Sequence, residues 1–152
     1  MWGMKDTRSS EANQKGERAM AFEYTYTVTT EQPVAAAVES VRKNLQENGF
    51  GTLWQLNVPE KLQEKGVEYQ REAVILEVCN PVHARNALEA NLQVIYFLPC
   101  KVVVFDENGT TTIGMVLPTV MMETLQDPAL TTFAREVEAT LQKAINASVT
   151  SA

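Results

Sequence analysis

The two cysteines and the single histidine of this chain are its most distinctive candidates for chemistry. Cys79 directly precedes Asn80-Pro81, His83 follows four residues after Cys79, and Cys100 comes later in the chain. Asparagine before proline is a strong signal for a helix start, because the Asn80 side chain caps free backbone N–H groups and proline tolerates the first helical position. We therefore expect Cys79 at the end of a strand and at the mouth of a helix.

This position predicts a reactive thiol. The free N–H groups and the dipole at a helix start favour a thiolate, so the pKa of Cys79 should lie below its reference of about 8.5. His83 could lean back toward Cys79 as hydrogen-bond partner or proton acceptor. Cys79 and His83 are thus the catalytic candidates, and Cys79, Asn80, His83 and Cys100 are the candidate ligand-binding residues.

A metal site is a further hypothesis for the same side chains. Cys79, His83 and Cys100 are candidate metal ligands of soft or borderline character. A conceivable fourth ligand is Met121, Met122 or Glu77. No C-x-x-C, H-E-x-x-H or other dense ligand spacing accompanies them. A Cys79–Cys100 disulfide would need Cα atoms within about 7 Å, and a reducing cytoplasm argues against it.

Simpler roles remain open for all of these residues. A lone cysteine in a strand is usually a small buried apolar residue, and a lone histidine is more often a satisfied surface or core group than a ligand. The cysteines could also line the wall of a ligand pocket without reacting. Elsewhere, Glu64-Lys65 and Arg135-Glu136 are most simply solvated helix faces.

The elements that must position these residues are predicted by hydrophobic periodicity and by turn signals. Strands are expected at Phe22–Thr30, 50–58, Glu72–Cys79, Cys100–Phe105 and Thr110–Leu117. The last two flank Asn108-Gly109, which favours a tight hairpin. Helices are expected at 31–48, at Pro81–Ala90 and from Asp127-Pro128 onward. A short helical turn should also end at Gly66.

This order predicts an α+β domain with a five-stranded, mostly antiparallel sheet. Two long helices can cover one face of such a sheet. The other face is left for a partner or a ligand, and an uncovered apolar face favours a homodimer. We expect one domain over residues 21–148, preceded by a flexible polar tail at residues 1–20.

Composition excludes several classes of function. The 152 residues carry a net charge of −6, which argues against nucleic-acid and membrane binding. Val94–Cys100 and Ile113–Leu117 are far shorter than the ~20 apolar residues of a membrane span. The N-terminal segment has no apolar core of a secretion signal, so we expect a cytoplasmic protein.

Several segments together resemble a bacterial and archaeal family known as domain of unknown function 302. They are Gly49-Phe50-Gly51, Leu62 with Lys65-Gly66, Val78-Cys79-Asn80-Pro81 with Ala84, and Leu98-Pro99-Cys100 followed by Val102-Val103-Val104. The bulky Ile95-Tyr96-Phe97 departs from the family pattern. The resemblance implies a fold similar to the TATA-binding-protein-like class (β-α-β4-α), often as a homodimer, without an established activity.

These observations lead to two functional hypotheses. The first is a homodimeric, non-enzymatic module that binds or senses a small ligand or a metal ion near Cys79 and Cys100. The alternative is a thiol-dependent enzyme in which Cys79 is the nucleophile and His83 its base. No cofactor is indicated by the sequence. Because only one histidine is present, most hydrolytic mechanisms lack their usual base.

Overall fold

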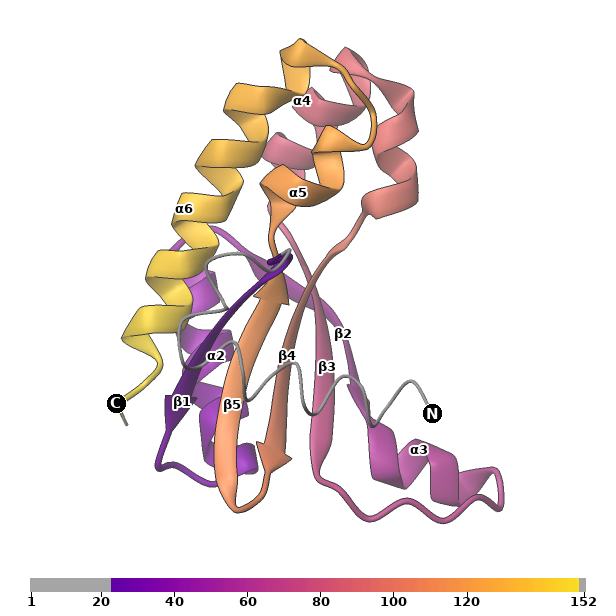
Figure 1. Ribbon diagram of the computed structural model, residues 1–152, viewed down its shortest axis with the longest axis vertical. Coiled ribbons are helices and arrows are strands. Elements are labelled where there is room, and N and C mark those ends of the chain that lie inside the picture. Colours follow the sequence, from indigo (N-terminus) through magenta and orange to yellow (C-terminus); the bar gives the residue numbers. More distant parts are fainter. Residues whose placement is uncertain (1–22, 151–152) are drawn as a thin grey trace.

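The five strands form one antiparallel sheet (Figure 1). The structure is a computed structural model that describes residues 23–150, so the expected tail at residues 1–20 lies outside the described residues. The strands are β1 (Thr25–Thr30), β2 (Gly51–Asn57), β3 (Ala73–Cys79), β4 (Cys100–Glu107) and β5 (Thr110–Val116), in the spatial order β1-β5-β4-β3-β2. Every neighbouring pair runs antiparallel, which confirms the predicted α+β class and sheet.

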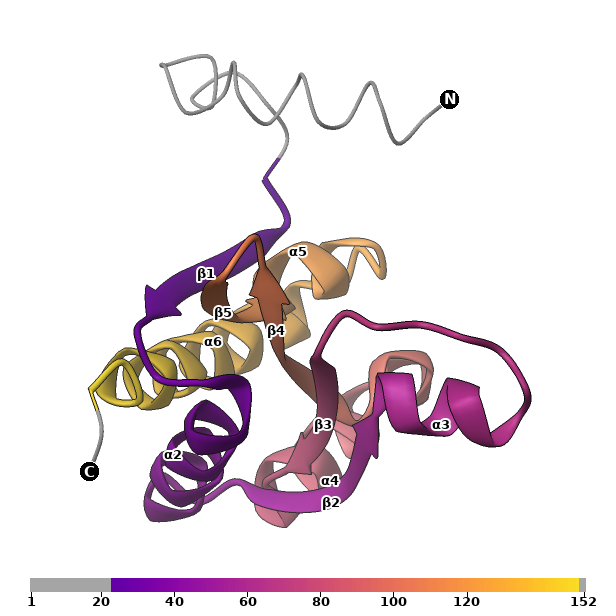
Figure 2. The same cartoon turned by 90° about the horizontal axis from the view of Figure 1, so that it is seen from below.

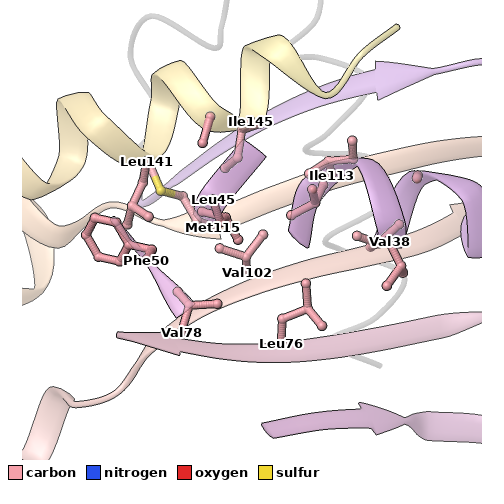
Figure 3. Close-up of a cluster of buried hydrophobic side chains, with 14 of the residues drawn as sticks. Val38, Leu45, Phe50, Leu76, Val78, Val102, Ile113, Met115, Leu141 and Ile145 are labelled. Carbon is pink, nitrogen blue, oxygen red and sulfur yellow. The ribbon is translucent and has the colours of Figure 1, made fainter. Parts of the chain in front are cut away.

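Two long helices cover one face of the sheet. Figure 2 shows α2 (Val34–Glu47) and α6 (Thr131–Ala147) on the same side of the strands. Their apolar stripes meet the inward side chains of the sheet in one main core (Figure 3), which includes Val38, Leu45, Phe50, Leu76, Val78, Val102, Ile113, Leu141 and Ile145. Alternate residues of each central strand therefore point into this core.

The β4–β5 hairpin follows from its two turn residues. Asn108 and Gly109 have φ angles of 55° and 88°, and Glu107 pairs directly with Thr110. Positive φ at both central residues is the geometry of a two-residue hairpin whose twist matches that of the strands. The sequence prediction for this hairpin is confirmed.

Shorter helices build a second core beyond one end of the sheet. They are α4 (Pro81–Ala90), the 3-10 helices η2 (Leu92–Phe97) and η3 (Pro128–Leu130), and α5 (Pro118–Glu123), which lie beside the start of α6 (Figure 1). The buried side chains of this second core are Ala87, Val94, Met122, Leu130 and, from α6, Ala134. Helix α3 (Val58–Glu64) follows β2 instead. No helix within residues 23–150 has the length and apolar character needed to cross a bilayer.

A polar network fastens the end of α6 to the turn between β1 and α2. The Thr30 hydroxyl donates to the carbonyl of Val149 at 2.6 Å, and the Gln32 amide donates to the carbonyl of Ser148 at 2.7 Å. Ser40 in turn donates to the Gln32 side-chain oxygen at 2.8 Å. The carbonyl groups that follow the last helix thus gain partners near the first strand.

Candidate functional site

The four predicted site residues lie together where β3 gives way to α4. Cys79 ends β3, and Asn80 is the N-cap of α4, with its Oδ1 accepting the backbone N–H of His83 at 3.0 Å. Cys100 begins β4 and pairs with Val78, the residue before Cys79. Cys79, Asn80, His83 and Cys100 consequently line one cavity.

This cavity is nearly filled. Its volume is about 10 Å³, and its other lining residues are mainly apolar: Phe50, Val78, Ala84, Leu98, Phe133 and Val137. Such a space is about the smallest that accommodates one water molecule. The four residues therefore border packed core, and this cavity is too small to hold an organic ligand.

His83 packs as an aromatic side chain. Its ring stacks on Phe50, with centroids 6.3 Å apart and planes 29° apart, and meets Phe133 edge-on at 6.0 Å. Within residues 23–150 its imidazole makes no hydrogen bond, so the expected contact with the Cys79 thiol is not formed. Aromatic packing of this kind stabilises a fold without any proton transfer.

For Cys79 the shift in pKa runs opposite to the predicted lowering. Burial raises the pKa of the Cys79 thiol above its ordinary value. Burial, and then the nearby Cys79 charge, raise the pKa of Cys100 to about 11. At the helix start Pro81 has no N–H and the N–H of His83 is already capped by Asn80, which leaves the N–H of Val82 in the first turn. Burial therefore favours the neutral thiol at both positions.

The residues proposed as metal ligands do not assemble. Within residues 23–150 no three His, Cys, Asp or Glu side chains are grouped so that they could hold a metal ion. Among the proposed fourth ligands, Met122 is buried in the second core and Glu77 pairs with Lys101 at 3.3 Å. Met121 lines a different cavity, which shares Leu98 and Cys100 with the first.

That second cavity, the Cys100 cavity, has a volume of about 220 Å³. It lies between η2, the start of β4, the end of β5 and the helices α5 and α6. Its lining residues are Glu77, Tyr96, Phe97, Leu98, Pro99, Cys100, Lys101, Val116, Pro118, Met121 and Leu141. Tyr96 is 78% exposed at this cavity. The Glu77–Lys101 ion pair supplies its charged groups.

Sequence reasoning named Cys100 but missed most of the Cys100 cavity. The departure at Ile95-Tyr96-Phe97 was the available signal, because Tyr96 and Phe97 both line it. Glu77, Lys101, Val116 and Leu141 lie in elements that the sequence predicts, but their convergence on one cavity is a tertiary feature. Met121 and Leu141 reach the cavity only because α5 and α6 fold over this end of the sheet.

Comparison with known proteins gives a family but no activity. A structure described as "Crystal structure of uncharacterized conserved protein DUF302 from Bacillus stearothermophilus" is similar to this chain, with a TM-score of 0.80 and 45% sequence identity. The match covers 84% of this chain and 99% of that chain. The comparison with curated proteins gave no match. Residues 26–148 match the family described as Domain of unknown function DUF302, and the chain belongs to that family.

Proposed function

We propose that this protein is a homodimeric, non-enzymatic module that binds a small, mainly apolar ligand in the Cys100 cavity. The observation that carries this proposal is the size and lining of that cavity, about 220 Å³ against about 10 Å³ beside His83. Ligand sites are typically apolar concavities in which a few polar groups fix orientation. The Cys100 cavity has this composition.

The lining defines the ligand's chemistry. Leu98, Met121 and Leu141 offer apolar contacts, whereas the Glu77–Lys101 ion pair offers an acceptor and a donor. The ligand is therefore mostly apolar and carries one group able to hydrogen-bond to a charged partner. It is also small, since drug-sized ligands occupy sites of about 300–1,000 Å³.

The thiol-dependent enzyme has less support than the binding module. A nucleophilic cysteine needs a lowered pKa or a base within hydrogen-bond reach. Burial raises the pKa of Cys79, and the His83 ring is held between Phe50 and Phe133. The cysteines serve better as wall residues, a role that small and weakly polar side chains fill well.

Support for a homodimer comes from the sheet face that α2 and α6 leave uncovered. The register places five apolar side chains on this face, which we call the open face: Trp54, Leu56, Ile75, Val103 and Phe105. Trp54 is 50% exposed. Apolar patches of this kind are typical of interaction surfaces, and a second copy of the chain would offer the same patch.

Indole is a suitable probe of the Cys100 cavity, because it is apolar and has one N–H that could donate to Glu77. In ¹H–¹⁵N spectra we expect saturable shift changes centred on Leu98 and Cys100. The variant Met121→Trp fills the cavity and should abolish these changes. Val82→Trp is the matched control, because Val82 is 56% exposed and lies outside the cavity lining.

Two results would contradict the proposal. One is the absence of saturable shifts with indole in the unmodified protein. The other is binding that persists undiminished in Met121→Trp while the variant unfolds as cooperatively as the unmodified protein.

A further inference from the structure

A separate hollow, which we call the α5–α6 hollow, lies between α5, η3 and the start of α6. Its volume is about 410 Å³, and it shares no lining residue with the Cys100 cavity. Met122, Leu130 and Ala134 line it with exposed fractions of 5%, 1% and 1%. The hollow therefore has an apolar floor, made of side chains that belong to the second core.

Two opposite charges flank this floor without neutralising each other. Glu123, at the end of α5, and Arg135, on α6, both line the hollow and are both exposed. Within residues 23–150 neither side-chain charge has an ion-pair partner, whereas Lys61 pairs with Glu64 and Lys101 with Glu77. A ligand with both charges could satisfy the two groups at once.

The third charged residue of the hollow is already engaged. Asp127 accepts the Asn91 side-chain amide at 2.9 Å and the Ala129 backbone N–H at 3.0 Å. Both carboxylate oxygens of Asp127 thus have partners inside the protein. Glu123 is the carboxylate of the hollow that is left for a ligand.

We propose that the α5–α6 hollow binds an apolar α-amino acid. Arg135 would take the carboxylate, since a guanidinium matches it with two parallel hydrogen bonds, and Glu123 would take the ammonium group. The apolar side chain would lie on the floor formed by Met122, Leu130 and Ala134. A zwitterion has no net charge, so the overall charge of −6 does not repel it as it would repel an anion.

The size of the hollow agrees with this ligand class. Its volume of about 410 Å³ is larger than that of the Cys100 cavity and gives a free amino acid room to enter. Glu123 and Arg135 are long side chains that can adjust to a small ligand. The inference is independent of the Cys100 cavity, because the two lie on different sets of residues.

Calorimetric titration with L-leucine tests the proposal. Two analogues separate the two charges: leucinamide keeps the ammonium group, and 4-methylpentanoate keeps the carboxylate. Arg135→Gln should weaken leucine binding about tenfold or more and leave leucinamide binding unchanged. Glu123→Gln should weaken leucine to a similar degree and leave 4-methylpentanoate unchanged. Glu136→Gln, an exposed neighbour outside the lining, is the control.

The proposal is overturned if L-leucine shows no saturable binding. It is also overturned if Arg135→Gln weakens leucine and leucinamide equally, because the guanidinium would then not contact the carboxylate. Met121→Trp, which blocks the Cys100 cavity, should leave leucine binding unchanged. Failure of indole binding and failure of leucine binding are therefore separate results.

Discussion

At the residue scale, Cys79 and Cys100 show how burial outweighs a helix start in setting thiol chemistry. The N-terminal N–H groups of α4 could stabilise a thiolate only if they were free to point at it. Pro81 has none, and the N–H of His83 is used by Asn80. The N–H of Val82 is left in this first turn, but burial disfavours the charged form and raises the pKa of both thiols.

Thiol alkylation measures this effect directly. In the single-thiol variants Cys100→Ser and Cys79→Ser, we expect iodoacetamide to react slowly at pH 7 and faster as pH rises. In Cys79→Ser, which keeps Cys100, the rate should reach half its maximum slightly below pH 11, because the neighbouring Cys79 charge that raises the pKa of Cys100 is removed. A Cys79 that reacts faster than free cysteine at pH 7 would restore the nucleophile hypothesis.

The sequence predicted which residues of the candidate site lie close together, but it did not predict their contacts or their pKa values. The end of β3 and the Asn80 cap can be recognised locally in the sequence. Together with the antiparallel pairing of β3 and β4, they place Cys79, His83 and Cys100 close to one another. The orientation of His83 depends on Phe50 and Phe133, which come from segments distant in sequence. The burial of the two thiols, which raises their pKa values, also depends on the tertiary structure and cannot be predicted from hydrophobic periodicity.

At the scale of elements, the end of α2 and the start of α4 are in direct contact. Gly49 follows the C-cap of α2 with a φ of 87°, and a Cβ added there would lie 2.9 Å from the Asn80 side-chain nitrogen. Asn80 is also the cap of α4. A side chain at position 49 would therefore strain its own backbone and displace the cap of another helix.

This contact predicts unequal costs for two similar substitutions. Gly66→Ala meets only the left-handed φ of 82°, which costs about 1–2 kcal/mol in an L-residue. Gly49→Ala should lower the free energy of unfolding by about 1 kcal/mol more, the typical value of an N-cap. Urea unfolding of both variants measures the difference.

A double variant gives the control for this prediction. In an Asn80→Ala background the clash is absent, so Gly49→Ala should cost no more than Gly66→Ala. Equal costs of the two glycine substitutions in the unmodified protein would show that the Asn80 side chain moves aside without loss.

The long elements were predictable because each repeats its pattern over several residues. β3 and the β4–β5 hairpin agree closely with the sequence prediction. α5 and η2 were not predicted, since Pro118–Glu123 and Leu92–Phe97 are too short to display a period. The second core, the Cys100 cavity and the α5–α6 hollow depend on these short helices.

At the scale of the whole molecule, the open face is the feature that bears on assembly. Val103 lies near its centre, paired with Ile75 on β3 and Gly114 on β5. If two copies associate through this face, Val103→Asp places a charge in the interface. Sedimentation equilibrium should then show a dimer for the unmodified protein and a monomer for the variant.

Val82→Asp is the matched control, because Val82 is exposed on α4, outside the strands that form the open face. It should remain dimeric. A monomeric unmodified protein at micromolar concentration, or a Val103→Asp variant that stays dimeric and folded, would contradict association through the open face.

The bonds that hold β1 come from residues near the C-terminal end of the domain, and this affects how the chain folds during synthesis. β1 pairs with β5, and Thr30 bonds to Val149, which is 119 residues later. On the ribosome β1 emerges first, yet it must wait for nearly the whole domain before it finds either partner. Until then β1 is an unpaired strand. The nascent protein is most vulnerable at this stage to pairing of β1 with strands of neighbouring chains.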